Sequence, residues 1–191
     1  MNEIHLQLLA SPEWAAYVED ELLPWALVGR DVGDDVLEVG PGPGLTTDVL
    51  RRHIARVTAV EVDAVLAAAL AERLRGSNVT VVCADATQTC LEADRFSAAT
   101  CFTMLHHMPT PEHQDRLFGE LARVLRPGGV FVGTDSIDTP DLRLLHVDDT
   151  FVPVDPETLP SRLSAAGFVD VTVERVDHRV HFAATKPRIR L

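Results

Sequence analysis

Apolar runs and amphipathic segments alternate along the middle of the chain. Short runs rich in valine, leucine and alanine are each followed by a segment with apolar residues at helical spacing. This alternation is typical of βαβ units, whose parallel strands are covered by helices on both faces. Strands are expected at residues 36–39, 57–62, 79–83, 96–104 and 130–134, and helices at 45–54, 64–74 and 110–125.

Segments of a different character flank this alternation. A helical lead-in at 11–28 is expected to be interrupted near Pro24, since proline lacks a backbone donor. Residues 135–155 are polar and acidic without periodicity, and loops of that length are often functional. A short helix at 156–166 precedes strands at 168–176 and 178–184, which are close enough to form an antiparallel pair.

The pattern therefore predicts an α/β fold in a single domain over residues 1–191. Its expected parts are a helical lead-in or lid (1–33), a ligand-binding core (34–134), a substrate loop (135–155) and a final helix with its strand pair (156–185).

Composition and charge narrow the class of partner. The 191 residues are 46% hydrophobic, which fits a globular domain rather than a disordered chain. The 29 acidic residues outnumber the 17 basic ones and give a net charge of −12. Because nucleic-acid affinity rests largely on neutralising phosphates, this charge disfavours nucleic acid and favours a small-molecule partner. The sequence does not indicate an oligomeric state.

The three cysteines contain no C-x-x-C pair, so neither a disulfide framework nor a zinc ribbon is indicated. Cys83 and Cys101 lie in apolar strands and are expected in the core. The first ten residues do not resemble a signal peptide, and no apolar run approaches the roughly 18 residues that cross a bilayer. We therefore expect a cytoplasmic protein without membrane insertion.

The most informative motif is Glu38-Val39-Gly40-Pro41-Gly42-Pro43-Gly44, between a strand and a helix. Alternating glycines let a backbone approach a ligand closely, and the following helix start offers unpaired N–H groups. A dinucleotide-binding loop would have G-x-G-x-x-G, whereas Leu45 follows Gly44 here. An acidic residue followed by G-x-G-x-G instead resembles the class I S-adenosylmethionine-dependent methyltransferases.

Positions downstream of the glycine motif extend this resemblance from about Asp35 to Thr134. Glu61 ends the second strand, where a carboxylate can accept hydrogen bonds from both ribose hydroxyls. Asp85 ends the third strand in a segment that resembles the family's adenine-reading motif. The resemblance implies S-adenosylmethionine as the cofactor. It also implies a Rossmann-like, doubly wound, mostly parallel sheet of order 3-2-1-4-5-7-6, with the last strand antiparallel. The residues that it implies as cofactor contacts are Glu38, Gly40, Pro41, Gly42, Gly44, Thr46, Glu61, Val62, Asp85, Ala86, Phe102 and Thr103.

The fourth strand leads into Leu105-His106-His107, which resembles an L-H-H motif of small-molecule members of the family. One of these two histidines is expected to face the acceptor and to take its proton where a base is needed, with structural capping or packing as the alternative. Two positions depart from the family pattern: Ser97 stands where many relatives have Asp, and Phe102 where many have a polar residue. The methionine end of the cofactor is therefore expected to be held differently.

The resemblance favours methyl transfer to a small-molecule or lipid-like acceptor, and other functions stay open. The glycine motif also resembles ribosomal RNA adenine dimethylases, but their Asn/Asp-Pro-Pro-Tyr-like motif is replaced here by residues 102–105. A non-catalytic protein that binds S-adenosylmethionine is the third reading.

Several side chains near the expected site allow two interpretations. We expect no metal site, because the spacing of His106, His107 and His113 matches no standard ligand set. The aspartates of residues 135–155 either attract a cationic acceptor or form a solvated loop. Three aromatic residues of the lead-in either cover the cofactor or pack in the core: Trp14, Tyr17 and Trp25.

Overall fold

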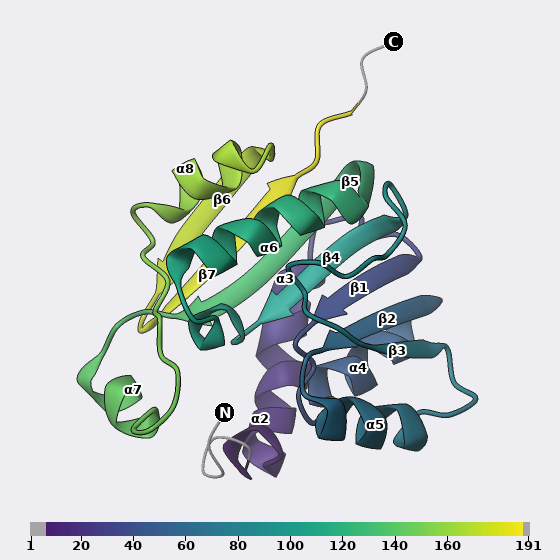
Figure 1. The fold of residues 1–191 in the computed structure, drawn as a ribbon, viewed down its shortest axis with the longest axis horizontal. Helices are drawn as coiled ribbons and strands as arrows, with labels where there is room; N and C mark the ends of the chain where they lie inside the picture. Colours follow the sequence, from purple (N-terminus) through teal and green to yellow (C-terminus); the bar gives the residue numbers. More distant parts are fainter. Residues whose placement is uncertain (1–6, 189–191) are drawn as a thin grey trace.

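A computed structural model describes residues 7–188, in which seven strands form a single sheet (Figure 1). The order β3-β2-β1-β4-β5-β7-β6 confirms the predicted Rossmann-like topology. β3, β2, β1, β4 and β5 pair in parallel, whereas β7 is antiparallel to both of its neighbours. The strands are β1 (Asp35–Val39), β2 (Arg56–Glu61), β3 (Val79–Cys83), β4 (Phe96–Phe102), β5 (Leu125–Ser136), β6 (Val169–Val176) and β7 (Arg179–Thr185).

Several helices begin at residues that can cap them. The side chains of Ser11, Asp63 and Thr110 accept hydrogen bonds from backbone N–H groups of the first turns of α2, α5 and α6. The helices are α2 (Pro12–Tyr17), η1 (Val18–Leu22), α3 (Leu23–Leu27), α4 (Leu45–His53), α5 (Ala64–Arg73), η2 (Leu105–His107), α6 (Pro111–Val124), α7 (Pro140–Leu145) and α8 (Leu159–Ala165). The first six residues of the expected lead-in and the last three of the chain lie outside the described part.

Helices cover both faces of the sheet, with α6 and α8 in front and α3 behind in Figure 1. Neighbouring residues of the central strands therefore pack in different clusters. Leu37 and Phe131 contact the cluster that contains α6 and α8, whereas Val36 and Val132 belong to the cluster with η1, α3 and α4. Burial on both sides explains why these strands are continuous apolar runs rather than alternating ones.

The lead-in differs from its prediction at Pro24. The helix continues through the proline because residues 18–22 form a π-helical turn, in which the Leu23 N–H donates to the Val18 carbonyl. A wider turn of this kind accommodates a residue that lacks an N–H. Leu22 and Leu23 on this turn are buried against the sheet, so packing stabilises the irregular turn.

Three other expectations are wrong in detail. β5 begins at Leu125 rather than Val130, because Leu125 pairs with Phe96 ahead of a register shift. The acidic stretch is not wholly irregular, since it contains α7, capped by the Thr139 side chain. Cys83 is exposed rather than in the core, because it ends the edge strand β3, while Cys101 on the central strand β4 is buried.

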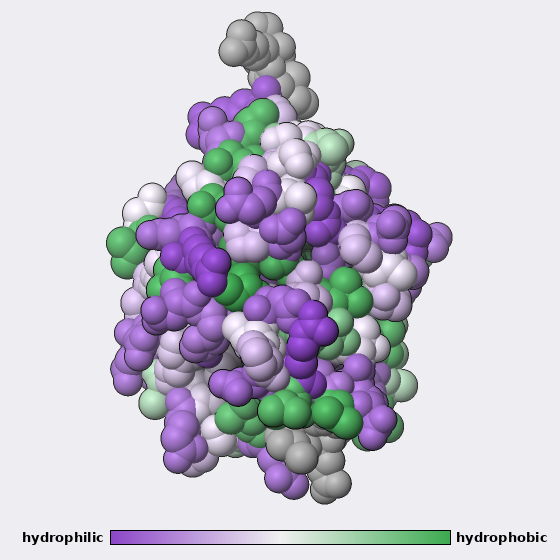
Figure 2. Space-filling view, turned by 90° about the vertical axis from the view of Figure 1, so that its left-hand side faces the viewer, coloured by the Kyte–Doolittle hydropathy of each residue, from purple (hydrophilic) through white to green (hydrophobic). Residues whose placement is uncertain are grey.

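The face of the molecule on the α7 and α8 side is mostly polar. In Figure 2, hydrophilic residues dominate the face on the α7 and α8 side, and hydrophobic ones form small scattered groups. Within residues 7–188, no helix is long and apolar enough to cross a bilayer.

Candidate active site

A cavity of about 600 Å³ opens at the carboxyl ends of β1, β2, β3 and β4. That volume lies within the usual range for small-molecule sites. In parallel α/β sheets, ligands bind at this edge, where the strand order reverses. Glu38 and Gly44 do not line the cavity, whereas the other expected cofactor residues do: Gly40, Pro41, Gly42, Thr46, Glu61, Val62, Asp85, Ala86, Phe102 and Thr103.

The glycine loop has a backbone that other residues rarely adopt. Gly40, Gly42 and Gly44 all have positive φ angles, of 67°, 53° and 89°. A Cβ atom added to Gly40 would lie 2.3 Å from Cγ of Met104. The loop therefore depends on glycine both for its conformation and for the space beside the cavity.

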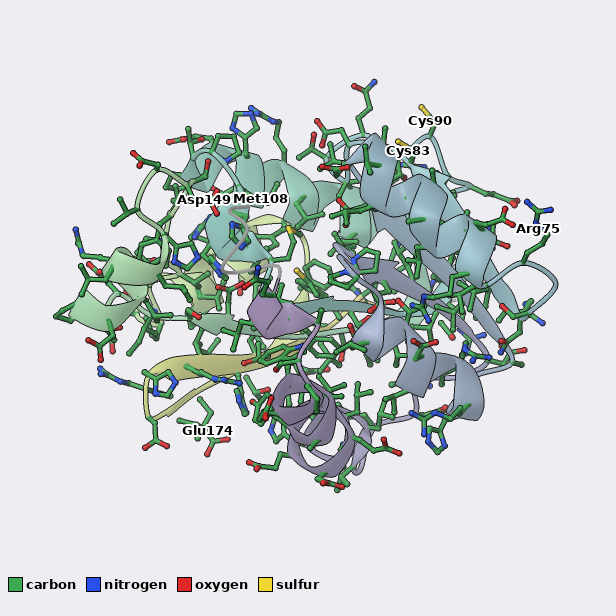
Figure 3. The ribbon with its side chains drawn as sticks, turned by 90° about the horizontal axis from the view of Figure 1, so that it is seen from below. Arg75, Cys83, Cys90, Met108, Asp149 and Glu174 are labelled. Carbon is green, nitrogen blue, oxygen red and sulfur yellow. The ribbon has the colours of Figure 1, made fainter. Side chains whose placement is uncertain are left out.

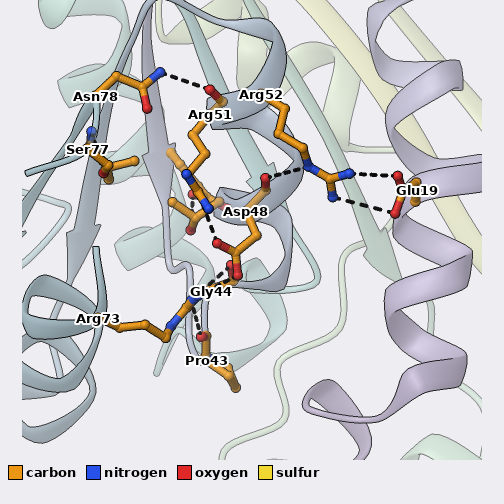
Figure 4. Close-up of polar contacts among 12 residues, drawn as sticks. Glu19, Pro43, Gly44, Asp48, Arg51, Arg52, Arg73, Ser77 and Asn78 are labelled. Atoms are coloured by element: carbon orange, nitrogen blue, oxygen red, sulfur yellow. Dashed lines mark hydrogen bonds and ion pairs between the residues drawn. The ribbon is translucent and has the colours of Figure 1, made fainter. Parts of the chain in front are cut away.

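Arg73 of α5 braces this loop from outside the cavity (Figure 4). Its guanidinium donates to the Pro43 carbonyl at 3.1 Å and pairs with Asp48 of α4 at 2.5 Å. The start of α4 is thereby tied to α5, on which the second and third strands pack. The bracing keeps the glycine N–H groups at a fixed position relative to the neighbouring strand ends.

Glu61 is the acidic group best placed for a ligand. Its side chain is only 7% exposed, yet it lines the cavity. One carboxylate oxygen accepts from the Gly42 N–H at 3.1 Å and the other from the Asp63 N–H at 3.0 Å. Each oxygen of a carboxylate can accept further hydrogen bonds, so the group is oriented for a diol.

The end of β3 supplies a second polar edge. Asp85 is exposed at the cavity, where one oxygen accepts from the backbone and hydroxyl of Thr87, both at 2.8 Å. The apolar side chains of Val62 and Val65, 71% and 77% exposed, line the same region. A flat ring that stacks on these valines could reach Asp85 with its edge.

Glu38 lies beneath the loop rather than in the cavity. One oxygen accepts from the Thr47 hydroxyl at 2.6 Å, and Oε1 has no hydrogen-bond partner among the described residues. Burial raises the pKa of Glu38 from 4.5 to about 7, although the Thr47 and Thr46 side chains oppose this shift. This carboxyl therefore supports the loop from below.

Replacing Glu38 with Gln should change how stability depends on pH. A carboxyl whose pKa is raised on folding contributes stability below its unfolded pKa, and that contribution is lost as pH rises through the folded pKa. As pH rises from about 4.5 to 7, the unfolding free energy of the parent should fall by about 3 kcal/mol relative to that of Glu38→Gln. Urea denaturation across this range measures the difference. The exposed Glu157→Gln should track the parent, and a constant offset for Glu38→Gln would contradict the raised pKa.

The other end of the cavity is lined by side chains of a different type. His107, Met108 and His113 come from the segment after β4, and Trp14 comes from α2. Thr103 holds the turn after β4 with a φ of 53°, and its N–H donates to the Thr134 carbonyl at 2.8 Å. The cavity thus joins a polar strand-end region to a region with histidine and thioether side chains.

The two histidines of the L-H-H segment separate in the structure. His107 lines the cavity, whereas His106 is 1% exposed and not part of its lining. His106 Nδ1 lies 2.6 Å from Oδ1 of Asp135, which also accepts from the Ser136 N–H, and Oδ2 accepts from the Leu105 N–H. The β5 carboxylate therefore fixes the buried imidazole.

His146 joins this pair, and sequence reasoning missed it. It follows α7 in the expected substrate loop, and its ring centroid lies 4.9 Å from that of His106 and 5.2 Å from that of His107. Burial lowers the pKa of His146. The sequence carried no spacing signal for this contact, because the loop between Asp135 and His146 brings the residues together. His113 is not a member of this cluster.

The aromatic residues of the lead-in have different surroundings. Trp14 lines the cavity. Tyr17 and Trp25 line a second hollow beside β6 and β7, where Trp25 packs against His181 with centroids 4.0 Å apart and planes tilted by 47°. Among these three, only Trp14 is placed to cover a ligand in the first cavity.

Figure 3 shows the molecule from below. In this view, Met108 and Asp149 lie on one side of the molecule and Cys83 lies on the other.

Comparison with known proteins gives one family and several relatives. A family model described as a methyltransferase domain matches residues 37–133, about half of the chain. The ubiquinone biosynthesis O-methyltransferase of Coxiella burnetii is 32% identical over 131 residues, which are 68% of this chain and 50% of that protein. The ribosomal RNA small subunit methyltransferase A of Deinococcus radiodurans is 47% identical over 58 residues, 30% of this chain and 20% of that one. The chain spans about half the length, or less, of these curated relatives.

A solved structure supports the same fold. Phosphoethanolamine N-methyltransferase 2 of Haemonchus contortus, in complex with phosphomonomethylethanolamine and S-adenosylhomocysteine, superposes with a TM-score of 0.74. The superposition covers 93% of this chain and 53% of that chain at 16% identity. At this identity, the likeness concerns the fold alone.

Proposed function

The chain belongs to the class I S-adenosylmethionine-dependent methyltransferase family, and on this basis we propose that it methylates a small-molecule or lipid-like acceptor. The cavity supports this proposal because it connects the cofactor-type residues at the strand ends with His107 and Met108. The names of the Coxiella and Haemonchus proteins indicate O- and N-methylation of small molecules.

The strand-end residues fit the cofactor. Glu61 is oriented by two backbone N–H groups toward a diol such as a ribose. Asp85 and the exposed Val62 provide a polar edge and an apolar face for an adenine ring. The positive φ of Gly40 and Gly42 lets the backbone approach the methionine part of the ligand. S-adenosylmethionine supplies a methyl group on a cationic sulfur.

The residues beyond the loop then position the acceptor. Methyl transfer from a sulfonium disperses charge, so alignment in a cavity that excludes water provides much of the acceleration. An acceptor hydroxyl or ammonium must also lose a proton. His107 is the member of the L-H-H segment that lines the cavity, and we assign proton removal to this histidine.

Replacing His107 with Ala should lower kcat by about 100-fold or more, because general-base catalysis contributes about 10²–10⁴. Binding of S-adenosylhomocysteine should be unchanged, since His107 lies beyond the strand-end residues. Steady-state methyl transfer from labelled S-adenosylmethionine at saturating acceptor measures kcat, and His53→Ala on the exposed face of α4 is the control. Full turnover in His107→Ala would contradict the assignment.

RNA methylation is the second candidate, supported by the short match to the Deinococcus protein. The net charge of −12 opposes it, as does the sequence Phe102-Thr103-Met104-Leu105 at the end of β4. The test supplies labelled S-adenosylmethionine with catechols, amino alcohols, polyprenyl phenols and 16S ribosomal RNA. Transfer to a small hydroxyl or amine supports the proposal, and transfer to RNA alone overturns it. Cofactor binding without transfer to any acceptor would favour a non-catalytic protein.

A further inference from the structure

Three histidines converge at the edge of the cavity. His106 and His107 belong to η2, and His146 follows α7. One ligating nitrogen from each lies within 4.8 Å of those of the other two. We propose that His106, His107 and His146 together bind one divalent transition-metal ion, for which zinc is the best match.

Two of the three rings are oriented for this role. His146 Nδ1 lies 2.7 Å from the Leu142 carbonyl oxygen, which can only accept, so Nδ1 carries the proton and Nε2 has the lone pair. His106 Nδ1 lies 2.6 Å from the Asp135 carboxylate, which also accepts hydrogen bonds from two backbone N–H groups. A histidine whose second nitrogen donates to a carboxylate or carbonyl is the usual arrangement at metal sites.

Packing holds the cluster together. His106 and His146 are 1% and 4% exposed. Phe151 stacks on His146, with centroids 4.5 Å apart and planes 25° from parallel. The Val152 N–H donates to the His106 carbonyl at 2.7 Å, so residues after His146 are tied back to η2. The loop is thereby kept where its histidine can reach the other two.

The ligand set selects the class of ion. Three imidazoles favour zinc, cobalt or nickel over magnesium and calcium, which prefer oxygen. Three protein ligands also leave a fourth position of a tetrahedral ion open, as in catalytic zinc sites. Because His107 lines the cavity as well, the ion would adjoin the space that we assign to the acceptor.

The consequence for catalysis rests on the proposed function. A hydroxyl bound to the ion would release its proton to solvent more readily. Its oxygen would then form the new O–CH₃ bond, while the electron pair of the broken S–CH₃ bond returns to sulfur. His107 would in that case assist deprotonation as a metal ligand rather than as the base itself.

The test begins with tag-free protein from which metal has been removed by a chelator. Calorimetric titration with zinc should give one site per chain, and cobalt should give the intense visible bands of a tetrahedral complex. His146→Ala should bind zinc at least about 100-fold more weakly, and Asp135→Asn about 10- to 100-fold more weakly, because it loses the orienting carboxylate. His53→Ala, a surface histidine on α4, should bind as the parent does.

Binding of S-adenosylhomocysteine to His146→Ala establishes that the variant is folded, since His146 does not line the cavity. Absence of stoichiometric zinc binding, or equal binding by the parent and His146→Ala, would overturn the inference. Zinc binding needs no acceptor, so it can succeed where methyl transfer fails. Transfer that persists in chelator, from protein that binds no zinc, would leave the proposed function intact and reject the metal site.

Discussion

Replacing Glu61 with Ala should weaken S-adenosylhomocysteine binding by about 100- to 1000-fold. Hydrogen bonds to a charged group contribute about 1.5–3 kcal/mol each, and the carboxylate faces the cavity with capacity for two ribose hydroxyls. Two such bonds in the lower part of this range contribute about 3–4 kcal/mol together, and 1.4 kcal/mol corresponds to tenfold in affinity. Isothermal titration calorimetry measures the change directly.

Two further variants separate ribose binding from support of the loop. Glu61→Gln keeps the size of the side chain, but only its carbonyl oxygen can accept from Gly42 or Asp63. It should lose about tenfold in affinity. The exposed Glu157→Ala should bind as the parent does. Affinity within about threefold of the parent for Glu61→Ala would show that this carboxylate does not hold the ribose.

The strand-end residues that line the cavity, among them Glu61, could be predicted from the sequence. Buried parallel strands are short apolar runs, and a polar residue or glycine marks where each one ends. Register then aligns these ends: Val39 pairs with Val60, and Glu61 with Cys83. A single motif with two downstream acidic residues was therefore enough to bring these residues to one edge of the cavity.

The half of the cavity near the histidines could not be predicted in the same way. His146 reaches His106 through a loop whose path depends on capping by Thr139 and on stacking against Phe151, and neither leaves a periodic signal. The L-H-H segment indicated that one histidine would face the cavity, but not which one. The carboxylate of Asp135 decides this, because it holds His106 in the interior.

The difference between local sequence patterns and tertiary packing also explains the errors in the predicted fold. Cys83 has apolar neighbours in sequence like those of Cys101, and only the position of β3 at the sheet edge exposes it. Pro24 stops an isolated helix, but the buried Leu22 and Leu23 stabilise a π-helical turn that accommodates it. Local patterns identify the elements, whereas tertiary packing decides their edges and irregular turns.

Replacing Asp135 with Ala should destabilise the fold by about 3–5 kcal/mol, because it removes the shared acceptor of three buried donors and each unsatisfied buried donor costs about 1–3 kcal/mol. Asp135 is 0% exposed, and its loss would leave the His106 ring and the N–H groups of Leu105 and Ser136 without this acceptor. Since domains of this kind are stable by only about 5–15 kcal/mol, the unfolding midpoint should fall sharply.

Urea denaturation in the presence of a chelator measures this loss without any contribution from bound metal. Asp135→Asn should lose less, about 1–2 kcal/mol, because its amide oxygen still accepts from one N–H group. Asp138→Ala, three residues away on the surface, removes only an exposed pair with Arg143 and should cost less than about 1 kcal/mol. If Asp135→Ala cost no more than Asp138→Ala, the buried carboxylate would not be what holds His106 in the interior, and the separate roles of the two neighbouring histidines would need another cause.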